Sequence, residues 1–596
     1  MPTPNSSPGS LMRMVFYILA VALALVHVFV TFRGISSAEG MNQAQLARQM
    51  ARTLTFQTRV IQPYALAQME KAGKAPSPLA MPETTQPPLP ALVWAPAFRA
   101  LERLGTYAPQ DGGSPIYFLD RVIAAIGVLG WLLTIFLTHG AARRLFDEQV
   151  AAIAAIALLV CQPGWDLAVS GSPRALLLPL FALAFRLFVS SAVRAEEGLG
   201  TGLRMLLLGL VCSALVLTHW LAWWMVAGIV AGLFLFLPGG RLGAVIVAVF
   251  PFTAMSALGW WNLQLCGDPL GGIKALFQAQ AAATAHELVL RDYTPGLPTV
   301  QVDDLLRRVG LGWQEQFGEI FTHLGLVVPA LLFFAALMHR FRSAPAGGAR
   351  WMITLVFALV ALGCGLTGLM EGARDDNALY IVLMPAMSVF GAAMIVVLWS
   401  RLQNGAGFWP RWGAAVVALV ITGLPMMVNL PVFLKFGLSM GSKMPPHWPP
   451  YVPERAAVLG RMVEKDEFLL SDAPGFVAWY ADVPCAALPV QRADFDTLRA
   501  TAAERGAKLA GIVMTPVSAR CERLTDIFTG PWAEWRDLII RGPMHAFDRD
   551  FSPEPEFPFR VVNPLIAVPV GTRESLNLPM VFYSEKERRA RAPETP

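Results

Sequence analysis

Residues 14–32 read MVFYILAVALALVHVFVTF, and residues 36–48, SSAEGMNQAQLAR, follow them almost at once. A helix needs roughly 20 apolar residues to cross a bilayer, so 14–32 predicts a membrane-spanning helix. The second stretch is polar, and its apolar residues recur with near-helical spacing. It predicts an amphipathic helix, able to lie at the membrane surface. Glu39 stands at the junction of the two and places a carboxylate at the mouth of an apolar bundle.

Apolar runs dominate most of the chain. The 596 residues are 55% hydrophobic and 15% charged, whereas soluble domains carry about 25% charged residues. The depletion is concentrated in 120–435, while 34–118, 268–324 and 436–596 have ordinary polar content. We predict a polytopic α-helical membrane protein with about 11 transmembrane helices, at 14–32, 119–138, 149–165, 174–192, 203–219, 221–238, 243–263, 325–340, 351–370, 379–399 and 412–434.

Basic residues between the spans predict the orientation of the chain. Cytoplasmic loops carry an excess of Arg and Lys. With the N-terminus in the cytoplasm, the short outside loops hold only Arg174 and Arg374, and the loops on the inner side hold Arg13, Arg143, Arg144, Arg194, Arg204, Arg241, Arg340, Arg342, Arg350, Arg401 and Arg411. The long loops 34–118 and 268–324 and the C-terminal region then face outward. We therefore expect a multi-pass protein of the bacterial inner membrane with a periplasmic C-terminal domain.

The ends of the chain differ in composition from the transmembrane domain, 14–435. Residues 1–13 are rich in Pro and Ser, which predicts a disordered cytoplasmic stub. Residues 436–450 are Pro-rich and predict a linker. In 451–596, predicted strands alternate with predicted helices, at 454–464, 467–470, 485–488, 494–506, 509–514 and 519–529. This alternation is typical of a small soluble α/β domain with a parallel sheet.

Several functional classes receive little support from the sequence. The net charge of +5 is explained by the short basic loops rather than by a nucleic-acid surface. His286-Glu287 is followed by Leu at position 290, so the zinc-protease pattern His-Glu-x-x-His fails. No CxxC pair or metal-type spacing occurs among the 6 cysteines. Cys485 and Cys521 fall in the outside domain, where an oxidising compartment permits a disulfide.

Three residues near the outer surface could carry chemistry. Ionisable groups at the edge of a membrane are scarce and often functional, although an acid such as Glu39 is also favoured in the first turn of a helix. His219 separates two spans and could bind an acceptor, or a divalent metal together with Glu39. Because Trp220, Trp223 and Trp224 surround it, His219 equally fits an aromatic belt. Asp166 lies in the second outside loop and could help an acceptor site.

Four short segments resemble those of GT-C superfamily glycosyltransferases, in the group of bacterial aminoarabinose transferases and protein O-mannosyltransferases. Residues 39–48, Glu-x4-Ala-Gln-Leu-Ala-Arg, resemble the first-loop signature and place Glu39 on its leading acid. Gln-Pro-Pro-Leu at 86–89 resembles the His-Pro-Pro-Leu element before the second span. Residues 371–374, Glu-Gly-Ala-Arg, resemble the late outside loop, and 478–482, Ala-Trp-Tyr-Ala-Asp, resemble a segment that precedes the α/β tail.

The chain also departs from this pattern. The leading acid is usually Asp and is Glu39 here, and the second acid of the pair is replaced by Gly40. Ser172-Pro173-Arg174 stands where an Arg-x-Asp site usually precedes the fourth span, and Asp166 is displaced from that position. These differences leave room for a different acceptor or for loss of activity.

The resemblance implies transfer of a sugar from a polyprenyl-phosphate donor to the hydroxyl of a glycolipid, polysaccharide or protein, by an inverting mechanism. Glu39 would be the catalytic base, and Arg374 would bind the phosphate, which the planar guanidinium suits. The other substrate-binding residues that we expect are His219, Asp166, Arg48 and Glu371. No cofactor is predicted with certainty, and a divalent metal stays open.

Two other functions remain: a non-catalytic assembly or binding protein on the same scaffold, and a transporter. Transport fits less well, since acids are scarce within the spans and the two halves lack inverted symmetry.

Overall fold

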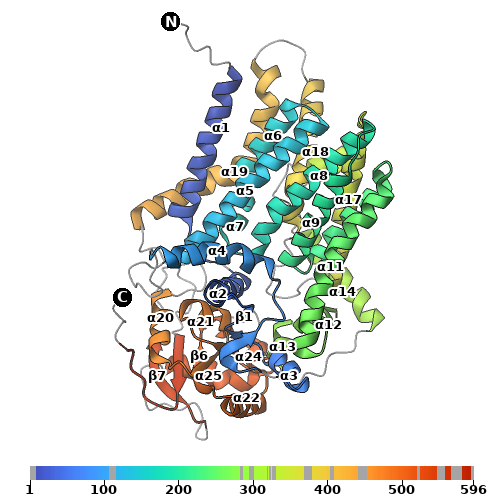
Figure 1. The fold of residues 1–596 in the computed structure, drawn as a ribbon. Helices are drawn as coiled ribbons and strands as arrows, with labels where there is room; N and C mark the ends of the chain where they lie inside the picture. The colour runs from blue at the N-terminus through green and yellow to red at the C-terminus, as the bar shows by residue number, and fades with distance from the viewer. Residues whose placement is uncertain are drawn as a thin grey trace.

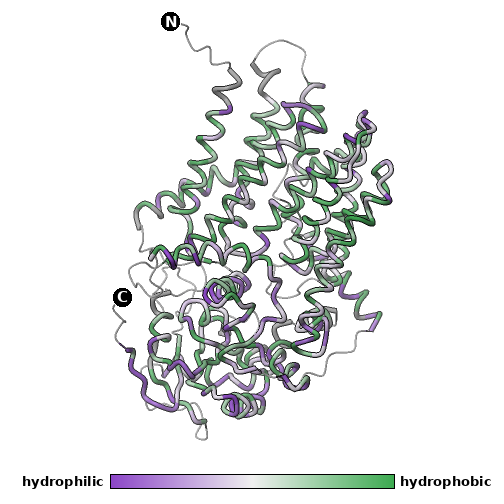
Figure 2. Tube along the Cα trace, in the orientation of Figure 1, coloured by the Kyte–Doolittle hydropathy of each residue, from purple (hydrophilic) through white to green (hydrophobic). Residues whose placement is uncertain are grey.

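The computed structural model describes residues 8–35, 37–74, 76–105, 116–281, 286–293, 301–318, 320, 324, 331–367, 379–402, 408–440, 453–519, 524–545, 557–565 and 580–591. A bundle of long apolar helices occupies one end of the molecule, and a mixed α/β part with the C-terminus occupies the other (Figure 1). The colouring in Figure 2 follows this division, with hydrophobic residues concentrated along the bundle helices.

The bundle contains seven helices long and apolar enough to cross a membrane, among the described residues. A further pair, α6 and α7, is bent by 56° at its break and counts as an eighth span if taken together. The bundle helices are α1 (Pro8–Leu25, continued by the π-helix Val26–Thr31), α5 (Phe118–Leu145), α6 (Glu148–Leu159), α7 (Gln162–Val169), α8 (Leu177–Glu196), α9 (Gly202–Thr218), α10 (Ala222–Phe236), α11 (Gly240–Cys266), α16 (Phe333–Leu337), α17 (Ala344–Thr367), α18 (Tyr380–Leu402) and α19 (Phe408–Met440).

These helices agree with most of the predicted spans. The predictions at 203–219 and 221–238 fall on α9 and α10, which are apolar but shorter than a full span. Residues 325–330 of the predicted span 325–340 lie outside the described residues. A polytopic helical membrane protein is therefore what the structure shows, and the count of about 11 stays a prediction.

The predicted stub 1–13 and the predicted linker 436–450 both contain helical residues in the structure. Helix α1 begins at Pro8, within the predicted stub 1–13, because Pro is compatible with a first helical turn and Leu11 and Met12 are good helix formers. Helix α19 continues to Met440, into the predicted linker 436–450. The remaining stub and linker residues, 1–7 and 441–450, lie outside the described residues.

Helices α2 (Ala38–Thr53) and α4 (Leu89–Arg103) of the first long loop lie between the bundle and the sheet (Figure 1). The first loop also forms α3 (Pro63–Lys71), which contacts α11 and α13, and the second long loop forms α12 (Gly272–Ala281), α13 (His286–Arg291) and α14 (Val302–Gly318), of which α14 packs along α17. Helix α2 packs against α4 and against α21 (Pro474–Tyr480) of the C-terminal part. Protein covers α2 on both sides, so its polar residues Gln43, Gln45 and Arg48 are buried together with its apolar ones.

The C-terminal part is built on a six-stranded sheet with the order β2-β5-β4-β6-β8-β7. Its strands are β2 (Val60–Ile61), β4 (Glu467–Ser471), β5 (Cys485–Ala487), β6 (Lys508–Met514), β7 (Arg560–Leu565) and β8 (Met580–Ser584), and a separate pair joins β1 (Gln57–Thr58) to β3 (Met81–Pro82). Strands β2, β5, β4 and β6 run parallel, as predicted for 467–514. Strand β8 runs antiparallel to both its neighbours, β6 and β7, so the sheet is mixed, which corrects the prediction of a parallel sheet.

Helices cover both faces of this sheet. One face packs on α2, α4, α20 (Pro453–Met462) and α21, through side chains such as Leu469, Val513 and Phe582. The other face, with Phe468, Ile512 and their neighbours, packs on α22 (Arg492–Glu504) and α25 (Arg536–Met544). The short helices α23 (Pro516–Ala519) and α24 (Leu524–Phe528) complete this part. The first long loop therefore supplies both an edge strand and a covering helix to the C-terminal fold.

Candidate functional site

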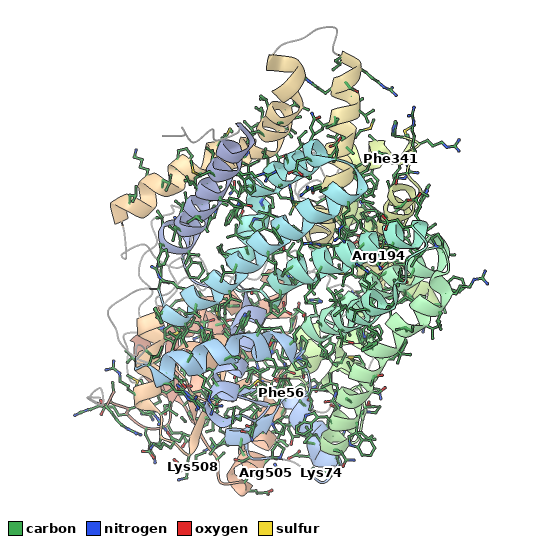
Figure 3. The ribbon with its side chains drawn as sticks, turned by 45° about the horizontal axis from the view of Figure 1, so that its top comes forward. Phe56, Lys74, Arg194, Phe341, Arg505 and Lys508 are labelled. Atoms are coloured by element: carbon green, nitrogen blue, oxygen red, sulfur yellow. The ribbon has the colours of Figure 1, made fainter. Side chains whose placement is uncertain are left out.

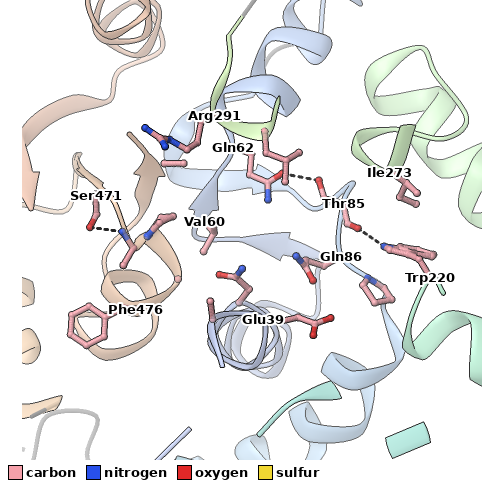
Figure 4. Close-up of a pocket in the computed structure, with 18 of the residues that line it drawn as sticks. Glu39, Val60, Gln62, Thr85, Gln86, Trp220, Ile273, Arg291, Ser471 and Phe476 are labelled. Atoms are coloured by element: carbon pink, nitrogen blue, oxygen red, sulfur yellow. Dashed lines mark hydrogen bonds between the residues drawn. The ribbon is translucent and has the colours of Figure 1, made fainter. Parts of the chain in front are cut away.

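A cavity of about 310 Å³ lies where the bundle, both long loops and the sheet meet. Figure 4 shows that Glu39, Gln86, Trp220 and Phe476 border this space from four different elements. Its lining comes from segments far apart in the sequence: Ala38, Glu39, Asn42, Val60, Gln62, Thr85, Gln86, Pro87, His219, Trp220, Leu221, Ile273, Phe277, Leu290, Arg291, Ser471, Asp472, Ala473, Pro474, Gly475, Phe476, Ala487 and Val517.

Glu39 is held at the cavity by the start of α2. Ser37 caps this helix, and its hydroxyl accepts a hydrogen bond from the backbone N–H of Gly40 at 3.0 Å. A carboxylate in the first turn is also favoured by the helix dipole. The Glu39 side chain is 21% exposed, so it is screened from bulk water yet open to the cavity.

Gly40 shows why this chain lacks the second acid of the resembling pattern. A Cβ atom at position 40 would lie 2.5 Å from the carbonyl oxygen of Gly171 and 2.9 Å from Cγ2 of Ile35. Real Cβ atoms do not approach backbone oxygens this closely, so no side chain fits here. The loop after α7 occupies the space that a second carboxylate would need.

His219 faces Glu39 across the edge of the cavity. It lies in the turn between α9 and α10, and its Nε2 atom is 3.8 Å from Oε1 of Glu39. Its Nδ1 atom accepts a hydrogen bond from the backbone N–H of Leu221 at 3.2 Å. The neutral tautomer consistent with this bond carries its proton on Nε2, the nitrogen that faces Glu39. The pair thus combines a carboxylate with an imidazole N–H.

The segment after β3 forms a second wall and is fixed by a buried acid. One oxygen of Glu83 accepts hydrogen bonds from the backbone N–H groups of Thr85 and Gln86, at 2.7 and 2.9 Å. Burial raises the pKa of Glu83, and these hydrogen bonds oppose the shift. Thr85 in turn donates its hydroxyl proton to Gln62 at 3.0 Å and accepts from the indole N–H of Trp220 at 2.9 Å. The first loop and the bundle are therefore tied together at the cavity.

The sheet supplies the third wall from the carboxyl ends of its parallel strands. Residues 471–476 follow β4, Ala487 ends β5 and Val517 follows β6. The chain moves from β4 to β5 on one side and then to β6 on the other, and such a reversal point is where open α/β sheets commonly bind ligands. Asp472 accepts hydrogen bonds from the hydroxyl and the N–H of Thr515, at 2.9 and 3.0 Å, and burial raises its pKa.

Arg48 does not line the cavity, although we expected it to bind substrate. Its side chain is 1% exposed and forms an ion pair with Asp482 at 3.0 Å. It also donates to the carbonyl of Ala478 at 2.8 Å and lies 4.6 Å from the ring centroid of Trp479. Through these contacts Arg48 connects α2 to α21.

The other predicted site residues lie apart from the cavity or outside the described residues. Asp166 is on α7 and is not among the lining residues. Arg374 and Glu371 fall within 368–378, which the structure does not describe. Cys485 is buried in β5, and Cys521 lies outside the described residues. The predictions for Arg374, Glu371 and the disulfide therefore stay predictions.

Among the described residues, no group of three or more His, Cys, Asp or Glu side chains is close enough to hold a metal ion. Glu39 and His219 together supply only two ligands.

Sequence reasoning missed Arg291, Gln62 and Asp472 as parts of the cavity. Arg291 lines it from α13, with its guanidinium 3.6 Å from the ring centroid of Trp532 and its Nε–H bonded to the carbonyl of Leu488 at 2.6 Å. No local pattern marks these residues, since each acquires its place only through the packing of distant segments. For the wall formed by the segment after β3, the sequence gave one signal, the Gln-Pro-Pro-Leu element at 86–89.

Comparison with known proteins shows a likeness of fold. No family model and no curated protein matches the sequence. ArnT from Cupriavidus metallidurans in the apo state is 14% identical, with 97% of this chain and 99% of that chain covered and a TM-score of 0.51. The structure of ArnT bound to undecaprenyl phosphate is 15% identical over 96% and 98% of the two chains, with a TM-score of 0.51.

A second similar structure is archaeal. The oligosaccharyltransferase AglB from Archaeoglobus fulgidus, in complex with an inhibitory peptide and a dolichol-phosphate, is 13% identical over 88% of this chain and 72% of that one, with a TM-score of 0.52. ArnT and AglB are GT-C glycosyltransferases, so the predicted GT-C fold is confirmed. At these identities the likeness is one of fold.

Proposed function

We propose that the protein is a membrane glycosyltransferase that moves a sugar from a polyprenyl-phosphate donor to a hydroxyl group of an acceptor. The observation that carries this proposal is the position of Glu39: the one acid that the sequence marked as catalytic lines the cavity between the bundle and the sheet. The similar structures with undecaprenyl phosphate and dolichol-phosphate support a lipid-linked donor, because they share this fold.

Glu39 has the chemistry required of a general base. In the proposed step the acceptor oxygen attacks the anomeric carbon as its proton passes to the Glu39 carboxylate. The bond from the anomeric carbon to the phosphate oxygen breaks, and polyprenyl phosphate leaves with the electron pair. A single displacement of this kind inverts the anomeric configuration. Because the Glu39 side chain is only 21% exposed, bulk water has little access to it and competes little with the carboxylate for the proton of the acceptor hydroxyl.

His219 has a positioning role in this proposal. Its Nε2–H faces Oε1 of Glu39 at 3.8 Å, so a side-chain movement of about 0.6–1 Å would bring the two atoms to hydrogen-bond distance. A donor on one carboxylate oxygen leaves the other oxygen to accept the proton.

The departing phosphate needs a cation, and we retain Arg374 as the proposed phosphate ligand, with Glu371 beside it. Asp166 is retained only as a residue that an acceptor could reach. The proposed location is the bacterial inner membrane, with the N-terminus in the cytoplasm and the cavity on the periplasmic side. Basic residues near the predicted inner ends of the bundle helices, such as Arg194 in the last turn of α8, support this orientation.

The direct test is identification of the lipid that co-purifies with the full chain, by mass spectrometry of the intact complex. We expect a polyprenyl phosphate that carries a sugar, and its delivery to a reconstituted protein should yield glycosylated acceptor and free polyprenyl phosphate. Absence of any polyprenyl lipid, together with no transfer from added donor, would contradict the proposal.

The glycine at position 40 favours one alternative function, that of a non-catalytic protein. A chain that has lost the second acid could keep the lipid site without catalysis, as a binding or assembly protein. Such a protein would retain the polyprenyl lipid and release no polyprenyl phosphate over time. The same experiment therefore separates the two functions.

A further inference from the structure

The second wall of the Glu39 cavity is formed by Gln62, Thr85, Gln86 and Trp220. Both of its amide oxygens are held in hydrogen bonds within the protein. Oε1 of Gln86 accepts from Nε2 of Gln43 at 3.2 Å, and Oε1 of Gln62 accepts the hydroxyl proton of Thr85 at 3.0 Å. Nε2 of Gln43 also donates to the carbonyl of Pro87 at 3.0 Å. Because a carbonyl only accepts, this bond fixes the nitrogen end of Gln43 toward Gln86.

The NH₂ groups of Gln62 and Gln86 are therefore the ends that remain for the cavity. Both residues line the cavity and are partly exposed. Among the residues that the structure describes, no oxygen accepts a hydrogen bond from either Nε2 atom. An amide NH₂ group carries two donors and no acceptor. A ligand in contact with this wall must therefore present oxygen lone pairs to it.

Trp220 adds an apolar ring in a fixed orientation to the same wall. Its indole N–H donates to the carbonyl of Thr85 at 2.9 Å. Its neighbour His219 lies 3.8 Å from Glu39, so the ring stands one residue from the proposed reacting atoms. In Figure 4, Trp220 and Phe476 lie on opposite sides of the space, and the Glu39 side chain extends toward the side of Trp220. An aromatic face attracts C–H groups, such as those of a pyranose ring.

The second wall carries no charged side chain among its lining residues. The charged residues Asp472 and Arg291 line other parts of the cavity, and each is held by hydrogen bonds within the protein. An ammonium group has three donors and no acceptor, so it cannot bond to the two amide NH₂ groups. An ammonium group paired with Glu39 would instead occupy the oxygens that take up the acceptor proton in the proposed reaction. The wall therefore suits hydroxyl groups better than a cation.

We propose that Gln62, Gln86 and Trp220 form the subsite for the sugar of the lipid-linked donor, and that this sugar is a single uncharged pyranose. The inference rests on the proposed transferase function and adds the chemical class of the sugar. The ring packs on Trp220, and its hydroxyl oxygens accept from the two amides. The cavity volume of about 310 Å³ lies at the lower end of the ~300–1,000 Å³ that small-molecule sites occupy, which suits one sugar unit.

The test measures the binding of three kinds of lipid to the full chain in nanodiscs, by native mass spectrometry. They are undecaprenyl phosphate, its hexose conjugates (glucose and mannose, measured separately) and its conjugate with 4-amino-4-deoxyarabinose, which is cationic. We expect the wild type to bind the better hexose lipid roughly tenfold more tightly than the other two kinds. Trp220→Leu should lose most of this preference and bind undecaprenyl phosphate as before, since that lipid has no sugar to contact the ring.

Gln62→Glu and Gln86→Glu test the charge assignment. Each substitution keeps the oxygen that bonds to Thr85 or Gln43 and replaces the NH₂ group with a second oxygen. Each variant should therefore favour the cationic lipid over the hexose lipid. Lys508→Gln is the matched control, because it also lowers the net charge by one. Figure 3 shows Lys508 at the sheet end of the molecule, and it does not line the cavity, so its variant should keep the wild-type preference.

The outcomes separate this subsite from the proposed function. A wild type that transfers hexose to an acceptor, yet has the same lipid preferences as Trp220→Leu, overturns the subsite and leaves the transferase function intact. A wild type that prefers the cationic lipid overturns the assignment of an uncharged sugar. A wild type that retains none of these lipids and transfers no sugar overturns the proposed function, and this inference with it.

Discussion

At the scale of single residues, the junction around Glu39 shows how packing determines which side chains chemistry can use. Glu39 projects into the cavity from the first turn of α2, while its neighbour Gly40 is pressed against the loop after α7. The sequence showed that the second acid was missing but gave no reason for it. The reason is steric, and it depends on a contact with Gly171, more than 100 residues away.

Substitution Gly40→Ala tests this close approach. The added methyl group would meet the Gly171 carbonyl at 2.5 Å and force a backbone shift, so we expect a loss of about 1–3 kcal/mol in stability. Thermal melting followed by tryptophan fluorescence would measure it. Gly310→Ala in α14 is the matched control, because nothing lies within 4 Å of a Cβ there and Ala is the better helix former. Equal melting of the two variants would contradict the steric explanation.

At the scale of elements, α2 is tied to α21 by a cluster of charges. Asp482 pairs with Arg48, Arg52 and Arg59, at 3.0, 2.7 and 3.0 Å. Periodicity correctly predicted the helix but could not show that protein covers α2 on both sides and buries Arg48. The resemblance likewise made Arg48 a substrate ligand, and the structure places it against Tyr117, Ala478 and Trp479 rather than in the lining of the cavity.

Stability should depend on pH through this cluster. Burial alone would raise the pKa of Asp482, but the guanidinium groups of Arg48, Arg59 and Arg52 outweigh it and lower the pKa below its usual value near ~3.9. A depressed folded pKa gives stability that is present above that usual value and is lost as pH falls through the folded one. We therefore expect Asp482→Asn to destabilise the protein by roughly 3–5 kcal/mol at pH 7, because buried Arg48 loses its partner.

The difference between wild type and Asp482→Asn should shrink as the pH falls below about 4, where Asp482 of the unfolded chain takes up a proton, and it should vanish only below the lower folded pKa. Melting curves recorded from pH 7 to pH 3 measure this convergence. Asn also tolerates the left-handed backbone at position 482, where φ is 57°, so the variant isolates the charge. The exposed control Asp496→Asn, on α22, should behave like the wild type. A gap that stays constant with pH would show that Asp482 acts by shape alone.

At the scale of the whole molecule, hydropathy predicted the helical bundle, and the alternation of strands with helices predicted the C-terminal α/β part. Neither pattern predicted how the two parts contact each other. The long apolar runs marked the bundle helices, and residues 467–514 marked the parallel strands. Strand β2 is only two residues long and pairs with β5, so its place depends on a contact between Val60 and Cys485. The cavity has the same origin, since its walls combine Glu39, His219 and residues 471–476. Such long-range meetings leave no local signal in a single sequence.

A fragment comprising residues 451–596 should therefore be unstable alone. It lacks β2, α2 and α4, so the apolar side chains of Phe476, Val477 and Trp479 would face water. We expect strong binding of the dye ANS and no cooperative melting transition. Joining residues 37–105 ahead of the fragment should restore cooperative melting and reduce dye binding. A fragment that melts cooperatively without the first loop would show that the C-terminal part folds independently.

The most direct measurement is the rate of sugar transfer by Glu39→Gln, with lipid binding recorded on the same samples by native mass spectrometry. The amide keeps the shape of the side chain but cannot take up the acceptor proton. We expect unchanged retention of the polyprenyl-linked sugar and a transfer rate lower by about 10²–10⁴-fold, whereas the control Glu504→Gln, an exposed acid on α22, keeps full activity. Transfer by Glu39→Gln at the wild-type rate would show that the carboxylate in the cavity is not the base.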